Sequence, residues 1–415
     1  MSTPAIDRRQ LMQDLSDLAR IGATADGGNT RLYCTPEYLE AQDWLRARMA
    51  AIGLEVITDA AGNVFGSFRP AGAAAEPAVY LGSHLDTVPN GGRYDGALGV
   101  TAALAAARAI VGSGGAARPF TVVCWADEEG ARFGAGLFGS RAATGDVTAD
   151  ELTTSRDATG VSRDEAMRQV GLDPDALPAA RLPQGAVRNY LELHIEQGAS
   201  LASSGTQIGI VEGIVGIVRY EVVFAGQANH AGTTPMHLRH DALRGAARLI
   251  SAIPGIAERH GSGRSVGTVG QISARPGAAN VIPGVAELTV ELRDLSSDVL
   301  KAMADEVARA ADQAARAEGL TVSLTLKDMA RPALLDQSLQ ARIADLCRAR
   351  GYSTASLPSG AGHDAQSLAP LAPSAMIFVP SRDGISHSPA EFTTADDCGN
   401  GAQILTDLLA SIVRD

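Results

Sequence analysis

The chain has 415 residues, too many for one typical hydrophobic core, so two domains are expected. Apolar residues make up 45% of it and aromatic residues only 4%, as in a globular α/β protein. The net charge of −12 argues against a nucleic-acid surface, and four cysteines without CxxC spacing argue against a disulfide framework. The N-terminus resembles no signal peptide, and no run of about twenty apolar residues predicts a membrane span. The cytoplasm is therefore the expected location.

The first half of the chain alternates strands and helices, which predicts a sheet with helices on both faces. In such a sheet, ligands bind beyond the carboxyl ends of the strands. The predicted elements are helices over 5–20, 36–52 and 99–110, a hairpin of strands 54–58 and 64–68, and strands over 78–81, 120–126 and 190–195.

The pattern changes near Gly209, where a long β-rich stretch over 210–224 begins. The elements that follow are a helix over 242–258, strands over 265–274 and 286–292, a helix over 297–317 with Ser297 as N-cap, and a strand over 321–326. This β-α-β-β-α-β order is that of a ferredoxin-like unit, which we place at 212–326 as an insert. The first domain then comprises 1–211 and 327–415, and it ends with a helix over 337–350, a strand over 374–379 and a helix over 396–413.

Acid and imidazole side chains gather where predicted strands end. The segments are His84-Leu85-Asp86, Asp95-Gly96, Asp127-Glu128-Glu129, His194-Ile195-Glu196-Gln197 and Ser386-His387. Each has an ordinary alternative: a solvated loop for His84 and Asp86, a helix N-terminus for the acids, a core histidine for His194. Together they supply the mixed nitrogen and oxygen ligands of a metal site. The sequence therefore favours a hydrolase with a metal-activated water.

Roles within this set can be assigned from chemistry. We expect Asp86 to accept the second imidazole N–H of His84 and so to orient that ligand. A carboxylate at Asp95, before a buried helix, would be satisfied as a bridge between two cations. Three adjacent acids repel one another unless cations are present, and one of them can act as a general base. The ligands expected are His84, Asp95, Glu129, His194 and His387.

Two other segments resemble motifs of other chemistries. Gly134–Gly139 matches GxGxxG but lies well beyond its strand, which disfavours a dinucleotide site. Ser359–Asp364 lacks the GxSxG elbow of a serine nucleophile. The roles of His363 and Asp364 stay open.

Over nearly its whole length the chain resembles the amidase, hydantoinase and carbamoylase branch of the dinuclear-zinc aminoacylase and peptidase group. The segments that carry the resemblance are Gly28–Leu32, His84–Gly92, Tyr94–Gly96, Glu128–Phe133, His194–Gly198, Asn229–Met236, Asn280–Pro283 and Ile385–Pro389. The wider group usually has an acid where this chain has His194. That histidine is typical of the ureido-cleaving branch.

The resemblance implies two divalent ions per subunit: zinc, or else manganese, cobalt or nickel. Asp95 would bridge them, Glu128 would be the general base, and the insert would be a lid and dimerisation domain. His230 would reach the partner's active site, while Gln197, Asn280 and Arg293 would bind the substrate. Without the resemblance, Arg293 would be interpreted as a surface ion-pair residue.

These implications favour an N-carbamoyl-L-amino acid hydrolase that releases the amino acid, carbon dioxide and ammonia. The substrate would be a small ureido compound with a carboxylate, and neither nucleic acid nor membrane is an expected partner. The closest alternative is an allantoate amidohydrolase, which the segment Phe138–Arg141 mildly disfavours, followed by a β-ureidopropionase. A dipeptidase and a non-catalytic binding module are alternatives of a different class.

Overall fold

The computed structural model of the protein describes residues 4–73 and 75–414. The chain divides into two compact units, the first made of Met1–Glu212 with Leu335–Asp415 and the second of Gly213–Leu334. The predicted insert, 212–326, ends earlier than the second unit does. The reason is that its last long strand continues to Ala330 and a short strand follows it.

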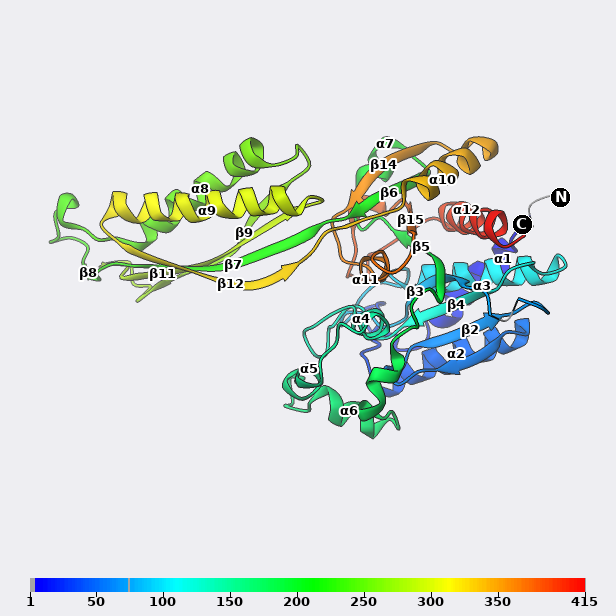
Figure 1. Ribbon diagram of the computed structural model, residues 1–415. Coiled ribbons are helices and arrows are strands. Elements are labelled where there is room, and N and C mark those ends of the chain that lie inside the picture. Colours follow the sequence, from blue (N-terminus) through cyan, green and yellow to red (C-terminus); the bar gives the residue numbers. More distant parts are fainter. Residues whose placement is uncertain (1–3, 74, 415) are drawn as a thin grey trace. The chain divides into compact units, whose positions relative to one another are not determined.

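The first unit contains a central mixed sheet flanked by helices (Figure 1). Its strands are β1 (Glu55–Thr58), β2 (Val64–Phe68), β3 (Ala78–His84), β4 (Phe120–Trp125), β5 (Val187–Ile195), β6 (Ile208–Ile214), β14 (Thr354–Ser359) and β15 (Ser374–Val379). They follow the order β1-β2-β4-β3-β5-β15-β6, with β13 (Ala333–Leu334) beyond β6, and β14 also pairs with β6. β4, β3, β5 and β15 are mutually parallel, whereas β2 and β6 join this group antiparallel. The predicted α/β class with a mixed sheet is thus confirmed.

The large helices of this unit share one apolar core with the sheet. They are α1 (Arg8–Leu18), α2 (Pro36–Ile52), α3 (Ala97–Gly112), α10 (Gln337–Arg350) and α12 (Ala395–Val413). α3 is almost entirely buried, as its alanine-rich sequence predicts. Across the described residues, no helix combines the length and apolar character needed to span a bilayer.

A second, smaller core lies around Tyr33 and Phe138. The short helices that contribute to it were not predicted from the sequence. They are α4 (Phe138–Thr144), α5 (Ala149–Thr154), α6 (Arg163–Gln169) and the 3-10 helix η1 (Pro174–Ala180). The other short helices of this unit are α7 (Ser200–Ser204), α11 (Asp364–Leu368) and η3 (Arg382–Gly384).

The second unit has the predicted β-α-β-β-α-β order. Its elements are β7 (Gly216–Ala225), α8 (Ala242–His260), β9 (Val266–Arg275), β11 (Val285–Asp294), α9 (Ser297–Glu318) and β12 (Thr321–Ala330). The sheet order is β12-β7-β11-β9, with every pair antiparallel, and α8 and α9 pack on one face (Figure 1). β8 (Asn229–His230) and β10 (Val281–Ile282) pair in a separate two-stranded ribbon. The 3-10 helix η2 (Met236–Leu238) follows β8 along the chain.

The β-rich stretch predicted over 210–224 consists of two strands, β6 and β7, which are separated at Val215. One local prediction was wrong. The N-cap of α9 is Ser296 and not Ser297, because the Ser296 side chain accepts the N–H of Val299.

Candidate metal centre

The candidate ligands follow four neighbouring strands of the sheet. In the order β4-β3-β5-β15, the acidic turn follows β4, His84 ends β3, His194 lies near the end of β5, and His387 comes after β15. Because the four strands are parallel, their carboxyl ends meet at one edge. From β3 the chain crosses to β4 on one side, and β5 lies on the other side. This is the switch point at which α/β sheets form a crevice.

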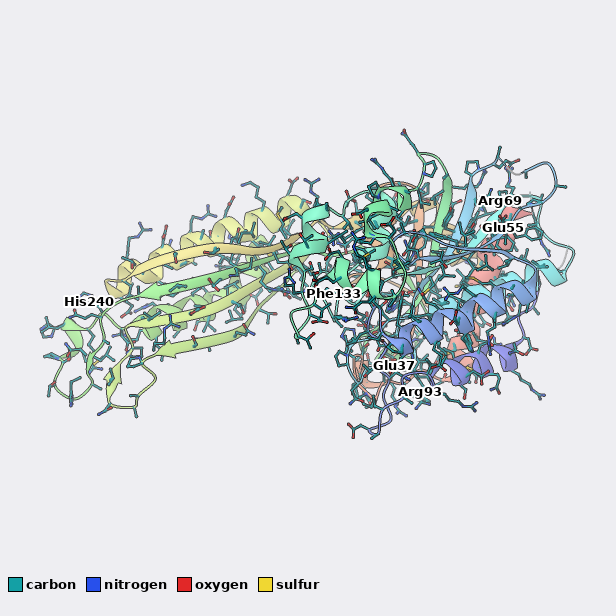
Figure 2. All side chains as sticks on the ribbon, turned by 90° about the horizontal axis from the view of Figure 1, so that it is seen from below. Glu37, Glu55, Arg69, Arg93, Phe133 and His240 are labelled. Carbon is teal, nitrogen blue, oxygen red and sulfur yellow. The ribbon has the colours of Figure 1, made fainter. Side chains whose placement is uncertain are left out.

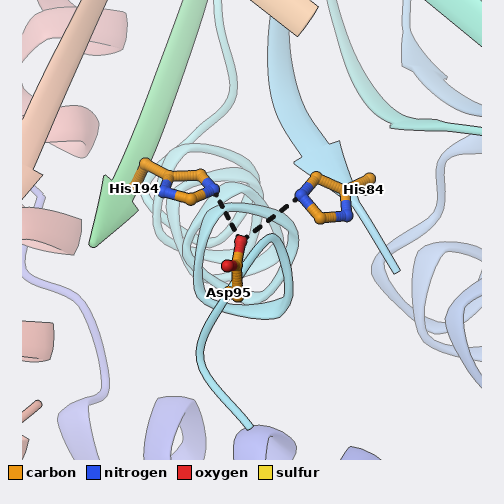
Figure 3. A group of neighbouring side chains, drawn as sticks. All are labelled: His84, Asp95 and His194. Carbon is orange, nitrogen blue, oxygen red and sulfur yellow. Dashed lines mark ion pairs between the residues drawn. The ribbon is translucent and has the colours of Figure 1, made fainter. Parts of the chain in front are cut away.

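A first half-site consists of His84, His194 and one oxygen of Asp95 (Figure 3). Asp95 Oδ1 lies 3.1 Å from His194 Nε2 and 3.6 Å from His84 Nε2. The opposite ring nitrogen of each histidine lies against a carbonyl: His84 Nδ1 is 3.1 Å from the Asp86 oxygen and His194 Nδ1 is 2.9 Å from the Ile195 oxygen. Each Nδ1 donates its proton there, which leaves both Nε2 atoms facing Asp95 in the position from which they would bind a cation.

A second half-site consists of His387, Glu129 and the other oxygen of Asp95. His387 Nε2 lies 3.3 Å from Asp95 Oδ2 and 3.4 Å from Glu129 Oε2. His387 is half exposed, unlike the other ligand candidates, which are buried or nearly so. Asp95 therefore faces one set of ligands with each oxygen, an arrangement suited to a bridging carboxylate.

The turn that presents Asp95 depends on a glycine. Gly96 has φ +63°, and a Cβ there would lie 2.4 Å from the His84 ring. On the opposite side, Ser386 Oγ contacts Asp95 Oδ2 at 2.9 Å and Glu391 Oε2 at 3.0 Å, and Glu391 Oε1 accepts the backbone N–H of Asp95. Neither Ser386 nor Glu391 was predicted as a site residue. The only sequence signal for them is proximity to His387.

Electrostatics in this cluster are dominated by crowded carboxylates. Burial raises the pKa of Glu128 well above its usual range, and the neighbouring charges of Glu129 and Asp364 raise it further. Burial and the Asp95 charge raise the pKa of Glu129 to about 7. For Asp95, burial favours a higher pKa, but hydrogen bonds from His194, His387 and His84 outweigh it and hold the pKa well below normal. Divalent cations would relieve this concentration of negative charge.

The carboxylate of Asp86 binds the acidic turn and not the imidazole. Its Oδ1 accepts the backbone N–H of Glu128 at 3.1 Å, and its Oδ2 accepts that of Glu129 at 3.0 Å. The same carboxylate lies 3.6 Å from His84 Nδ1, farther than the Asp86 carbonyl does. The expected contact between Asp86 and His84 is thus made by the backbone, and the side chain instead shapes the turn that carries Glu128 and Glu129.

The candidate ligands line a cavity of about 230 Å³ in the first unit. Its lining includes all five predicted ligands with Glu128 and Gln197, and also His363, whose role the sequence left open. Gly136, Leu137, Ala361 and Gly362, which were not predicted, complete the lining. Gln197 donates from Nε2 to Asp95 Oδ2 at 2.8 Å, and its Oε1 is buried with no hydrogen-bond partner among the described residues.

His363 lies beside the first half-site and lines the cavity, whereas Asp364 is buried and does not line it. The His363 ring packs edge-on against the His194 ring at 4.4 Å between centroids, and its Nε2 is 2.8 Å from Ser359 Oγ. Burial and the nearby His194 lower the pKa of His363 well below its usual range. The contact supports the orientation of the His194 ring.

Three predicted residues belong to the second unit. His230 pairs with Val281 across the β8–β10 ribbon, and the Asn280 carbonyl accepts the N–H of Ala231. His240, labelled in Figure 2, lies near the ribbon, because its carbonyl accepts the N–H of Gln227, which precedes β8. Arg293 lies at the other end of β11, where its Nε donates to Glu291 at 2.8 Å. Asn280 and Arg293 are therefore not neighbours within one copy of the chain.

Comparisons with known proteins agree with this geometry. Residues 80–411 match Peptidase family M20/M25/M40. The chain is 43% identical over 405 residues to the N-carbamoyl-L-amino acid amidohydrolase of Geobacillus stearothermophilus, with 96% of this chain and 97% of the relative covered. It is 37% identical over 393 residues to the allantoate amidohydrolase of Bacillus subtilis (strain 168), with 94% of each covered.

A solved structure extends the likeness to three dimensions. An amidase of the hydantoinase/carbamoylase family from Burkholderia multivorans superposes with a TM-score of 0.91 at 34% identity, with 99% of each chain covered. The resemblance inferred from the motifs is confirmed. The chain belongs to the M20/M25/M40 peptidase family of metal-dependent hydrolases, and within it to the hydantoinase/carbamoylase amidases.

Proposed function

We propose that the protein hydrolyses the C–N bonds of the carbamoyl group in N-carbamoyl-L-amino acids. The products would be the L-amino acid, carbon dioxide and ammonia. The observation that carries the proposal is the pair of half-sites that share Asp95 beside Glu128. Relatives named for this activity, at up to 43% identity, support the choice of substrate class.

The residues present fit two divalent cations. Three imidazoles and two carboxylates face the cavity in two sets, and this nitrogen and oxygen donor set suits zinc, manganese, cobalt or nickel. His84, His194 and Asp95 would hold one ion, and His387, Glu129 and Asp95 the other. Bound there, the ions would supply the Lewis acidity that activates water and polarises the ureido carbonyl.

Glu128 is the general base in this proposal. It belongs to neither half-site, yet its Oε2 lies 3.7 Å from His84 Nε2 and it lines the cavity. A carboxylate in this position can accept the proton of the attacking water and deliver it to the leaving nitrogen. Glu128 therefore connects the attack on the carbonyl carbon to the departure of the nitrogen.

His230 can stabilise the oxygen on which negative charge develops. Its Nδ1 accepts the backbone N–H groups of Gly232 at 3.0 Å and Thr233 at 3.2 Å. The neutral ring must then carry its proton on Nε2, so an exposed donor is available. A donor aimed at the developing oxyanion lowers the barrier of acyl transfer.

A homodimer would allow Asn280 and Arg293, which lie far apart within one copy of the chain, to contact the same substrate. Residues 285 and 293 of β11 are about 27 Å apart at the rise of an antiparallel strand. Asn280 precedes the first of these and Arg293 is the second, so one small carboxylate cannot contact both in the same copy. We propose that Arg293 comes from one subunit and that His230 and Asn280 come from its partner.

Product release by the metal-loaded protein tests the substrate: ammonia is measured for the ureido compounds, and free amino acid for the dipeptide, which releases no ammonia. Faster turnover of N-carbamoyl-L-amino acids than of allantoate, N-carbamoyl-β-alanine or a dipeptide is the expected result. Preference for allantoate would keep the site roles and change the substrate. Preference for N-carbamoyl-β-alanine would indicate a β-ureidopropionase. Dipeptide cleavage, or silence on all four, would contradict the proposal.

Mixing two inactive variants tests the shared site. Glu128→Gln and His230→Ala would each inactivate their own homodimers. A mixed dimer would contain one site with both native residues. Random exchange would then restore about a quarter of the wild-type activity. No recovery after verified subunit exchange would show that His230 does not act across an interface.

A further inference from the structure

A buried arginine lies behind the acidic turn without lining the cavity. Arg163, the first residue of α6, has no exposed side-chain surface. Its Nη1 lies 2.9 Å from Asp127 Oδ2, and its Nη2 donates to the Ala135 carbonyl at 3.0 Å. Burying such a charge is costly unless its partners are well placed.

Aromatic rings fix the plane of this guanidinium. Its central carbon lies 4.2 Å from the centroid of Phe138 and 5.2 Å from that of Phe133, which Figure 2 labels. Contacts with two rings and one carbonyl leave the group little freedom to move. Arg163 is therefore a rigid partner for Asp127.

The turn held by Arg163 has a strained backbone. Asp127 has φ +51°, a left-handed conformation that costs energy for a residue with a Cβ, although less for Asp than for most residues. Asp127 directly precedes Glu128 and Glu129, both of which line the cavity. Its carbonyl accepts the N–H of Phe138 at 3.1 Å, and the Glu128 carbonyl accepts that of Leu137 at 2.7 Å. The direction in which the chain leaves β4 thus determines where both carboxylates point.

Two groups hold this turn from different sides. Asp86 accepts the N–H groups of Glu128 and Glu129, whereas Arg163 contacts the side chain of Asp127 and the Ala135 carbonyl. Asp86 fixes the backbone after Asp127, and the Phe138 N–H binds the Asp127 carbonyl, but neither contact holds the Asp127 side chain. Arg163 supplies that additional restraint.

We propose that Arg163 is a positioning residue that keeps Glu128 aligned for proton transfer by holding Asp127 in its left-handed conformation. This inference rests on the proposed function, in which Glu128 is the base. The ordinary alternative is that Arg163 only neutralises a buried aspartate. The two differ in which second substitution rescues an Arg163 variant.

The test compares Arg163→Met alone with two double variants. In Arg163→Met, which keeps the apolar volume, we expect kcat to fall by about ten- to a hundredfold with KM within about twofold. Adding Asp127→Ala removes the unpaired carboxyl group but keeps a Cβ at positive φ, so thermal stability should recover and kcat should not. Adding Asp127→Gly also removes the strain, because glycine adopts positive φ freely, so kcat should recover as well.

Equal rescue of kcat by the alanine and glycine double variants would reduce Arg163 to charge balance and overturn the proposal. A wild-type kcat in Arg163→Met would overturn it as well. Arg163→Lys serves as the conservative variant, because it keeps the charge but cannot contact Asp127 and the Ala135 carbonyl through two separate nitrogens. We expect a kcat between those of wild type and Arg163→Met.

A wild-type protein inactive on every ureido substrate would refute the proposed function and not this inference. The visible absorption of the cobalt-loaded protein then tests whether Arg163 positions the turn, because Glu129, a candidate metal ligand, lies in the same turn. A spectrum altered in Arg163→Met and restored by adding Asp127→Gly supports positioning. An unaltered spectrum in Arg163→Met excludes it.

Discussion

Metal stoichiometry gives a sharp test of the two half-sites. His387→Ala removes a ligand from the second half-site only, so the metal content should fall from two ions per chain to one. Asp95→Ala removes the group common to both, so it should abolish tight binding of either ion. Metal content after gel filtration, measured by mass spectrometry, distinguishes these outcomes. His260→Ala, on α8 of the second unit, is the matched histidine control.

Loss of the ions should also lower Tm, by an amount that follows from the free energy of ion binding. At a free ion concentration one hundred times Kd, each occupied site stabilises the fold by about 2.7 kcal/mol. For a 415-residue chain 1 kcal/mol corresponds to about 1 °C in Tm, so chelation should lower the wild-type Tm by about 6 °C. The same treatment should lower the Tm of His387→Ala by about 3 °C and leave that of Asp95→Ala unchanged.

Comparing each variant with and without chelator removes the effect of the substitution on the metal-free fold. Two ions retained by His387→Ala, or one retained by Asp95→Ala, would refute the assignment of Asp95 as the shared ligand. Retention of both ions by His260→Ala is required for the comparison to be valid.

Three further substitutions have defined outcomes. Glu128→Gln should keep both ions but lower kcat by about 10²–10⁴, measured as ammonia release, and near wild-type turnover would exclude Glu128 as the base. Gly82→Ala should prevent pairing of β3 with β4, because the added Cβ would lie 1.8 Å from the Val123 carbonyl oxygen. Gly112→Ala, with nothing within 4 Å, should fold normally, as circular dichroism can show. Thr394→Ala removes the N-cap of α12 and should cost about 1 kcal/mol in denaturant unfolding, whereas Thr394→Ser should cost much less.

Much of the fold was predictable because apolar runs and their terminators are local. The bounds of α10 and β15 match the prediction to the residue, since each is an apolar pattern ended by a glycine or a proline. The gathering of ligands was also predictable, because each candidate follows a strand and parallel strands end at one edge. The sequence could not show which strands are neighbours. The structure shows that the four strands that carry or precede the ligands are adjacent, in the order β4-β3-β5-β15.

Contacts between side chains and distant backbone were not predictable. Asp86 was expected to pair with the imidazole of His84, two residues away, but its carboxylate binds N–H groups more than forty positions along the chain. The region 137–180 was not assigned any elements because its helices are too short for an apolar period to develop. Arg163 lies in that region, so its ion pair with Asp127 was missed as well.

The metal ligands alone cannot select between an N-carbamoyl amino acid and allantoate. Both substrates present the same ureido carbon, and relatives named for each activity match this chain over nearly its whole length. Selection must come from groups that contact the rest of the substrate. Apart from the candidate ligands, Glu128, Gln197 and His363, the walls of the cavity in the first unit are Gly136, Leu137, Ala361 and Gly362, which offer no side-chain hydrogen bonds. A second ureido group against these four residues, as in allantoate, would lose its hydrogen bonds to water without replacement by a side chain there, whereas an apolar amino-acid side chain would not. We therefore expect N-carbamoyl derivatives of apolar amino acids to be turned over fastest.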